Sequence, residues 1–443
     1  MSTNDARINR RQLLRTATFG GLALRSVATG LPASLLLRPG VGRTQSDPRS
    51  GGPGRILMLF CSQSGDPVNA NVPGCYGPGA EEVAHSADPR MAPTQLRLSG
   101  RQYTAAKPWA DLPQSVLDQT VFFHHATYTP VHQDQSKVMK LMGATDDDEM
   151  LVSILSKALA PKQGSVQAVP LSLGARGGSE LLTARGQILA NVGPRSIARA
   201  LGGPTGSLAN LAELRDREID RIYALYREHG TKHDVALLDA WARSRNEVRS
   251  VSDELVSRLD AIDNDNEDSQ VTAAAVLAGM NITPALTLRG TFGGDNHNDG
   301  GLARETTQTV SGVARMGRLM AEVDALQRQG VLRHEVIVGT LNVFGRTLRK
   351  KGTAGRDHNR GHHVTVMMGP GLRGSVIGSI ERSGNDYVST AIDSTTGAGG
   401  GGDIPFEETL GSMAKTLGTA LGVDRATLDA HIELGKPVTA ALA

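Results

Sequence analysis

Aromatic residues are scarce in this chain: they make up only 3% of its 443 residues, whereas it contains 52 glycines. A low aromatic content implies a core of valine, leucine, isoleucine and alanine, and the many glycines imply many loops. A chain of this length buries enough apolar surface to fold as one large α/β domain with an insertion or as two ordinary domains. Length and composition therefore leave the activity open.

Cysteine is almost absent, since Cys61 and Cys75 are the only two. They do not resemble a zinc ligand pair, because the Cys-x-x-Cys spacing is missing. In an oxidising compartment the two thiols could form a disulfide. Cys61 also ends an apolar run, which equally favours a small buried side chain. Both interpretations stay open at this point.

The part of the chain that follows the N-terminal segment also lacks an excess of basic residues. Residues 1–50 contain eight arginines and two aspartates, so the net charge of +2 becomes −4 when they are left out. A protein that neutralises nucleic-acid phosphates needs a basic surface. The sequence therefore predicts no nucleic-acid partner.

The N-terminal residues have the composition of an export signal. Asn9–Arg15 reads NRRQLLR, which resembles the twin-arginine signal, and a moderately apolar stretch follows over residues 16–37. Arg25 lies within this stretch, and an arginine at a bilayer centre costs roughly 2.5–3.5 kcal/mol. We predict a signal peptide and linker over residues 1–50, recognition by the twin-arginine translocase, and a periplasmic or extracellular location. No Ala-x-Ala cleavage site follows, so an uncleaved signal that anchors the protein to the membrane stays open.

Downstream of the linker, apolar runs of strand length alternate with helical patterns. The runs are Ile56–Phe60, Val121–Phe123, Ala285–Leu288, Val336–Leu341 and Val364–Met368, and the helical patterns are Glu149–Leu159, Val271–Met280, Thr306–Gln329 and Phe406–Leu421. Continuous apolar runs indicate strands that are covered on both faces, as central parallel strands are. The alternation predicts an α/β domain over residues 55–443, with a mostly parallel central sheet and helices on both faces.

Residues 205–265 interrupt this alternation. Leucines and isoleucines recur there at helical spacing, Ser207 is a candidate N-cap, and Gly230 separates two helical patterns of which the second reaches Asp260. We predict a long antiparallel helical hairpin inserted into the α/β domain.

The strongest signal for chemistry is the loop Gly355–His363, which reads GRDHNRGHH. Adjacent residues on a strand point to opposite sides, so Asp357 and His358 reach one metal ion only from a turning loop, which Gly355 and Gly361 permit. A carboxylate oxygen beside an imidazole nitrogen suits Zn²⁺ or Mn²⁺ better than Ca²⁺. We predict that both residues are metal ligands; the alternative is a solvated polar loop.

A second polar cluster, Gly293–Gly300, contains an Asp-x-His pair. This spacing places Asp295 and His297 on one side of an extended segment, as two ligands of one ion require, although the same residue types also favour a simple turn. Asp299 is a poorer candidate. Asp66 follows the first predicted strand, at the edge where α/β folds place their chemistry.

Two further residues are candidates for catalysis. Arg346 follows a strand and precedes the metal loop, so its guanidinium could bind a phosphate or sulfate, or it could form a salt bridge that holds the loop. Thr127 or Thr129 could be an alkoxide nucleophile if a metal lowered the pKa of its hydroxyl. No sequence feature selects between them, and we take Thr129 as the candidate. Three nearby histidines could be ligands, hydrogen-bond donors or packed core residues: His124, His125 and His132.

In this order, the motifs resemble the exported domain-of-unknown-function family numbered 1501, which is similar to the sulfatase and alkaline phosphatase clan. The twin-arginine signal, Asp66, the GGDNH stretch, Phe344–Thr347 and Gly355–His358 carry the resemblance, which spans roughly residues 55–385. It implies a two-metal site on the carboxyl edge of the central sheet, with Asp66, Asp357 and His358 holding one ion and Asp295 and His297 the other. Two such ions could clamp the attacking and leaving oxygens of an in-line displacement. The implied activity is hydrolysis of a phosphate or sulfate ester of a small molecule or glycan.

The chain departs from the pattern of that clan at several positions. His362 and His363 follow the Asp-His pair almost at once and only His431 lies later, Val343 stands where the clan has glutamate, and no Cys- or Ser-x-Pro-x-Arg sulfatase signature is present. These departures keep an alternative open: a non-catalytic exported protein that binds a metal or an anion on the same fold.

Overall fold

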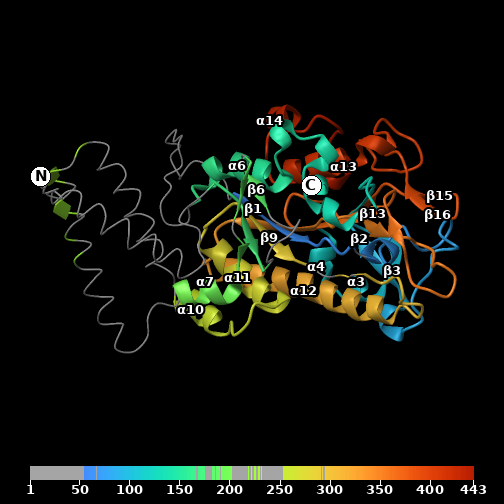
Figure 1. The fold of residues 1–443 in the computed structure, drawn as a ribbon, viewed down its shortest axis with the longest axis horizontal. Coiled ribbons are helices and arrows are strands. Elements are labelled where there is room, and N and C mark those ends of the chain that lie inside the picture. Colours follow the sequence, from blue (N-terminus) through green and yellow to red (C-terminus); the bar gives the residue numbers. More distant parts are fainter. Residues whose placement is uncertain are drawn as a thin grey trace, which may run out of the picture.

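The computed structural model describes residues 54–443 except Asp66, 166–167, 175–181, 185, 190, most of 202–252, 291 and 293–294. The described part contains an eight-stranded sheet with the strand order β14-β4-β13-β10-β1-β9-β5-β8 (Figure 1). Its strands are β1 (Arg55–Cys61), β4 (Thr120–His125), β5 (Leu171–Leu173), β8 (Asn191–Val192), β9 (Ala285–Arg289), β10 (Glu335–Thr340), β13 (His363–Met368) and β14 (Ser375–Ile377).

The predicted α/β class with a mostly parallel sheet is confirmed. Each of the five apolar runs forms a strand, and β1 pairs in parallel with both β9 and β10. Alternate residues of β1 enter the two cores: Ile56 and Met58 pack on one face of the sheet, whereas Leu57 and Leu59 pack on the other. A strand covered on both faces has no solvated side, which explains its unbroken apolar sequence.

Strand β13 is the exception, because it runs antiparallel to both β10 and β4. The chain between β10 and β13 contains a short hairpin, β11 (Gly345–Arg346) with β12 (His358–Asn359), and no helix. A parallel neighbour needs a crossover connection, usually a helix. Without one, the chain re-enters the sheet at the edge where β10 left it.

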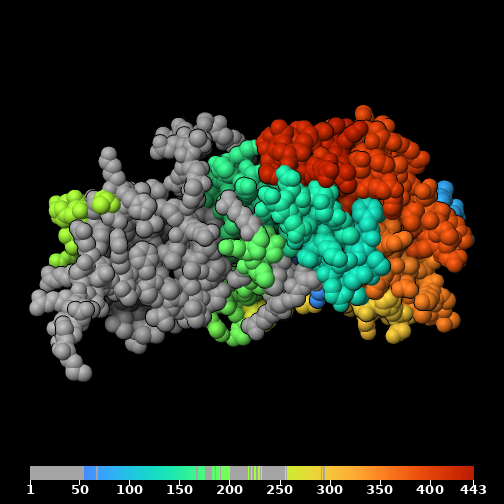
Figure 2. Space-filling view, turned by 45° about the horizontal axis from the view of Figure 1, so that its top comes forward, coloured from blue at the N-terminus to red at the C-terminus, as the bar shows by residue number. Residues whose placement is uncertain are grey.

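Helices cover both faces of the sheet (Figure 1). One face carries α11 (Glu267–Gly279) and α12 (Ala303–Arg328), and the other carries α6 (Leu151–Gln163) and α13 (Thr409–Ala420). The side chain of Asn266 caps α11 by accepting a hydrogen bond from the backbone N–H of Ser269. In Figure 2 the red C-terminal segment lies directly beside the teal-to-green segment that ends in α6, as expected for elements sharing one core.

Two predictions fall mainly outside the described residues. The signal peptide at residues 1–50 lies there entirely, and so does most of the predicted hairpin at 205–265. At the end of the latter, α10 (Asp253–Asp260) packs against α11 and α7 (Pro194–Leu201). Within the described residues no helix is long and apolar enough to cross a membrane.

Cys61 and Cys75 are both buried and are not joined by a disulfide. The thiol of Cys75 donates a hydrogen bond to the backbone oxygen of Asn69 over 2.9 Å. Burial raises the pKa of this thiol far above its usual range. The structure therefore agrees with the interpretation as buried thiols and not with the disulfide.

Candidate metal centre

The candidate residues lie on loops at one edge of the central sheet. Strands β1, β4, β9 and β10 end at this edge, and β13 begins there because its direction is reversed. In α/β sheets the loops at the carboxyl ends of the strands are the usual place for a ligand. Loops from distant parts of the chain therefore meet at this edge.

Four predicted ligands come together in these loops. The Nε2 atom of His297 lies 2.9 Å from Nε2 of His358 and 3.2 Å from Oδ1 of Asp295. Its Nδ1 atom lies 3.6 Å from Oδ1 of Asp357. Asp66, the fifth predicted ligand, lies outside the described residues.

Three groups of side chains in the described part of the chain could hold a metal ion, because the ligand atoms within each group lie within 4.8 Å of one another. Two of them share His358: one is His132, Asp295 and His358, and the other is His297, Asp357 and His358. The third group is completely buried and consists of Cys75, His124 and His362. The sequence left the role of His132 undecided, and the structure places this residue among the candidate ligands.

Hydrogen bonds fix the tautomers of two histidines in this centre. Nδ1 of His132 lies 2.7 Å from the backbone oxygen of Gln63, and Nδ1 of His358 lies 2.6 Å from that of Pro130. A carbonyl oxygen only accepts, so each Nδ1 carries the hydrogen and each Nε2 keeps its lone pair in the neutral ring. A metal-binding histidine characteristically donates its other N–H to a carbonyl or carboxylate in this way.

Aromatic packing holds the ring of His358 in place. The ring of Phe344 is stacked on it, with 4.3 Å between centroids and 27° between planes. The ring of His132 packs edge-on against both, at 4.6 Å from His358 and 4.9 Å from Phe344. The Phe-Gly-Arg-Thr motif therefore packs Phe344 against a candidate ligand as well as supplying Arg346.

Local charges favour the ligand forms of His358 and Asp357. Burial, reinforced by the positive charge of Arg346, lowers the pKa of His358, so the ring stays neutral. Partial burial would by itself raise the pKa of Asp357, but hydrogen bonds from the His358 N–H and from Lys351 outweigh it and lower that pKa. A neutral imidazole beside an ionised carboxylate is what a divalent cation binds.

Arg346 lies on β11, opposite His358 on β12, and its side chain is fully buried. One guanidinium nitrogen donates to the backbone oxygen of Ser64 over 2.6 Å and lies 3.4 Å from Oδ1 of Asp295. The other terminal nitrogen lies 3.4 Å from Nε2 of His297. The salt bridge that the sequence offered as one interpretation is therefore present, and the positive charge of Arg346 lies directly beside the candidate ligands.

A buried ion pair joins the two loops that carry the candidate ligands. Arg356 donates to Glu305 from Nε over 2.7 Å, and neither side chain is exposed. Glu305 also accepts hydrogen bonds from the amides of Asn71 and Asn296. Since Asn296 lies between Asp295 and His297, and Arg356 precedes Asp357, this carboxylate holds both loops together.

Gly355 allows these loops to approach. A Cβ atom at this position would lie 1.8 Å from the backbone oxygen of Asn296, so no other residue fits without moving the loop. Asp299 has a different task, since its carboxylate accepts hydrogen bonds from the N–H groups of Ala303 and Glu305 at the start of α12. Both carboxylate oxygens are thus used to cap the helix, which is consistent with the expectation that Asp299 is a poorer metal-ligand candidate.

Thr129 makes hydrogen bonds within its own turn. Its hydroxyl donates to Oδ2 of Asp134 over 2.6 Å and accepts from the N–H of Val131. The hydroxyl of Thr127, in contrast, is buried without a hydrogen-bond partner among the described residues. The structure does not select a nucleophile between them.

Four histidines at the end of β4 and around the start of β13 are completely buried, with their rings in contact in two pairs: His124 with His362, and His125 with His363. Burial lowers the pKa of His124 and of His125 to about 4, and it lowers the pKa values of His362 and His363 well below 6.5. The folded protein therefore keeps these rings neutral at pH values where the unfolded chain protonates its histidines.

We predict that the free energy of unfolding falls as the pH drops from about 6.5 towards 4. In that window the unfolded chain binds protons that the folded chain does not bind. Each such histidine then lowers the free energy of unfolding by about 1.4 kcal/mol per pH unit. Urea unfolding at pH 7, 6 and 5 measures this. Carboxylates with a lowered pKa, such as Asp88 at about 2, lose their contribution only at lower pH. Equal stability at pH 7 and pH 5 would contradict the prediction.

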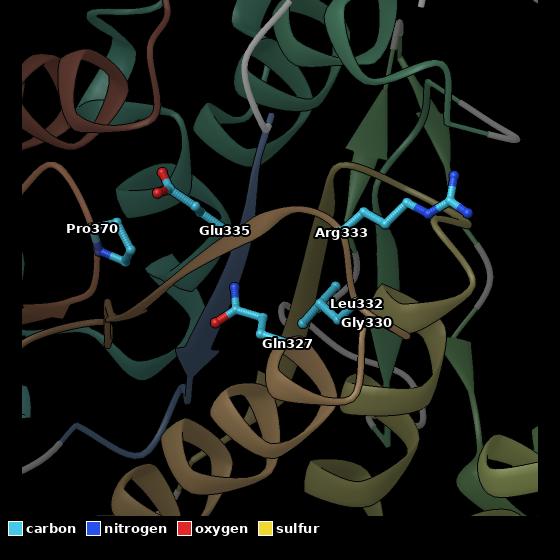
Figure 3. Close-up of a pocket in the computed structure, with 6 residues that line it drawn as sticks. All are labelled: Gln327, Gly330, Leu332, Arg333, Glu335 and Pro370. Carbon is cyan, nitrogen blue, oxygen red and sulfur yellow. The ribbon is translucent and has the colours of Figure 1, made fainter. Parts of the chain in front are cut away.

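An open hollow at the opposite edge of the sheet is separate from this centre. It lies where β10 begins and is lined by Gln327, Gly330, Leu332, Arg333, Glu335 and Pro370 (Figure 3). None of the candidate ligands lines it. The chemistry suggested by the sequence therefore does not involve this hollow.

Comparisons with known proteins do not identify a family. No protein family matches the chain, and no curated protein matches it. A solved structure described as that of the PH0037 protein from Pyrococcus horikoshii is 12% identical, with a TM-score of 0.26, over 73% of this chain and 89% of that one. A likeness this weak carries no argument about fold or function.

Proposed function

We propose that this chain is an exported metal-dependent hydrolase of phosphate or sulfate esters, built on an alkaline-phosphatase- or sulfatase-like domain as its resemblance to family 1501 implies. The observation that carries the proposal is the convergence of His132, His297, His358, Asp295 and Asp357 beside a buried arginine. In this proposal the twin-arginine signal delivers the protein to the periplasm or beyond, and residues 205–265 form a helical insertion.

The donor set fits Zn²⁺ or Mn²⁺ better than Ca²⁺. His132 and His358 offer Nε2 lone pairs from fixed tautomers, and Asp295 offers a carboxylate oxygen in the same group. Two imidazoles with one carboxylate are a known ligand set of catalytic zinc, whereas calcium takes oxygen ligands. A divalent ion held here would act as a Lewis acid and lower the pKa of a water molecule.

The charges of the centre favour an anionic substrate. Arg346 is paired with Asp295 and Lys351 with Asp357, so these four side chains cancel one another. A divalent cation added to them makes the centre positive, which attracts a phosphate or sulfate ester. Arg346 then serves to stabilise negative charge on the oxygens of the ester, and Phe344 keeps His358 oriented towards it.

A non-catalytic protein that binds a metal or an anion is the second candidate. The hydroxyl of Thr129 is bonded to Asp134, which favours a centre without an activated threonine. Binding without turnover would still use the same ligands and the same arginine. The two candidates therefore differ only in whether an ester is hydrolysed.

The deciding experiment is an assay of the purified protein without residues 1–50. Aryl phosphates, phosphodiesters and aryl sulfates are offered with Zn²⁺, Mn²⁺ or Ca²⁺ after removal of bound metal. We expect turnover of at least one ester class that a chelator abolishes and Zn²⁺ or Mn²⁺ restores. Tight metal binding without turnover of any ester supports the second candidate and contradicts the first.

A further inference from the structure

The buried group of Cys75, His124 and His362 has the residue types of a zinc site, but its hydrogen bonds indicate a different role. All three side chains are fully buried. Asn69, in the short 3₁₀ turn Pro67–Ala70 after β1, links this group to the strand that carries Arg346. The direction of each hydrogen bond follows from the chemistry of the atoms.

The orientation of the Asn69 amide is fixed by Arg346. The backbone N–H of Arg346 donates to Oδ1 of Asn69 over 3.2 Å, so the other amide atom is the NH₂ group. This NH₂ group donates to the backbone oxygen of Arg346 over 2.8 Å and to Nδ1 of His362 over 3.1 Å. Asn69 therefore holds both backbone polar groups of Arg346, as a neighbouring strand would.

The histidine pair then has one consistent arrangement of hydrogens. His362 accepts at Nδ1, so its Nε2–H donates to Nδ1 of His124 over 2.9 Å. His124 accepts at Nδ1, so its Nε2–H donates to the backbone oxygen of Pro73 over 2.9 Å. With the Cys75 thiol donating to the backbone oxygen of Asn69, every ring nitrogen and the sulfur has a partner while all remain neutral. Neither imidazole therefore has a free nitrogen lone pair for a metal ion, and the sulfur is a protonated thiol rather than a thiolate.

We propose that Asn69 is a positioning residue, which holds β11 so that Arg346 faces the metal centre, and that His362 and His124 lock its amide in the required orientation. A Cβ atom at Gly345, the residue before Arg346, would lie 2.2 Å from the backbone oxygen of His362, so β11 packs directly against His362. The role in anion binding rests on the proposed function, whereas the hold on the strand does not.

The first variant is Asn69→Asp, which keeps the size of the side chain and the acceptor for the Arg346 N–H. It replaces the donor with an oxygen that faces only acceptors: the Arg346 carbonyl, Nδ1 of His362 and, farther away, the His362 carbonyl. We expect the affinity of the zinc-loaded protein for inorganic phosphate to fall about 10- to 100-fold, as for Arg346→Gln, because a charge-assisted hydrogen bond contributes on that order. Isothermal titration calorimetry measures both affinities.

The double variant Asn69→Asp/Arg346→Gln tests whether the two residues act together. If Asn69 acts through Arg346, the double variant binds phosphate no more weakly than Arg346→Gln alone. Additive losses would overturn the proposal, and so would an unchanged affinity in Asn69→Asp. Thr416→Val is the matched control, since Thr416 is equally buried and hydrogen-bonded but lies within α13.

Two further measurements separate this inference from the proposed function. Zinc content by elemental analysis should be the same in Cys75→Ser as in the unaltered protein, and a loss of zinc would show that the buried group is a metal site. Hydrogen exchange at the Arg346 amide should be slow in the unaltered protein and at least about tenfold faster in Asn69→Ala. If the unaltered protein binds no phosphate, the proposed function fails, and the exchange result alone decides whether Asn69 holds the strand.

Discussion

Replacing His358 with alanine should abolish metal binding at the centre. His358 is shared by the two candidate ligand groups that are not fully buried, so its loss removes one ligand from each. The direction of its Nε2 lone pair is also well determined, because the hydrogen bond to Pro130 fixes the tautomer and stacking on Phe344 fixes the ring orientation. We expect the affinity for Zn²⁺ to fall by more than about 100-fold, beyond the effect of losing a residue that only orients a ligand.

The measurement is zinc content after dialysis, followed by titration of the metal-free protein with a competing chelator. The control is His431→Ala, because His431 is a half-buried histidine at the end of α14 (Arg425–His431) and belongs to none of the three ligand groups. Full zinc content in His358→Ala would show that the convergence of these loops is not a metal centre, and the hydrolase proposal would fail with it.

Asp357→Asn gives a graded result in the same measurement. If Asp357 is a ligand, as its motif predicts, the variant loses metal as completely as His358→Ala does. If it only orients His297, whose Nδ1 lies 3.6 Å away, we expect a loss of about 10- to 100-fold in affinity. Either outcome assigns the carboxylate a role, and no change would remove it from the centre.

The sequence predicted the sheet, and it marked most of the candidate ligands, for local reasons. An apolar run of five or six residues is nearly sufficient to define a buried strand, as β1 and β10 show. Asp-His and Asp-x-His are ligand types at short spacings, so Asp295, His297, Asp357 and His358 were recognisable without knowledge of the fold. The convergence of their two loops is the part that only the structure could supply.

What the sequence did not predict depends on contacts between distant residues. Nothing near His132 distinguished it from His124, yet the turn after β4 places His132 in the candidate metal centre, whereas His124 is buried in the core. The reversed direction of β13 follows from the missing crossover helix, which the polar stretch before it could have indicated. Asn69 and Glu305 carry no motif, because the arginines that they contact, Arg346 and Arg356, lie more than fifty residues away along the chain.

Replacing Glu305 with alanine should destabilise the protein by about 3–5 kcal/mol, the usual cost of leaving a buried charge without its partner. Both oxygens of this carboxylate face Arg356, with Nε–Oε2 at 2.7 Å and Nη2–Oε1 at 3.1 Å, and neither side chain reaches solvent. Asn71 and Asn296 lose an acceptor in the same variant. The measurement is the free energy of unfolding in urea at pH 7.

Asp324→Ala is the matched control for this prediction, because Asp324 lies on the same helix and pairs with Arg328 on the exposed surface. An exposed pair contributes little, so its loss should leave the urea midpoint almost unchanged. Glu305→Ala should also weaken metal binding, since Asn296 lies between two ligands and Arg356 precedes a third. If Glu305→Ala unfolds at the same urea concentration as the control, the prediction is contradicted. The ion pair would then not be what holds the two loops of the candidate centre in position.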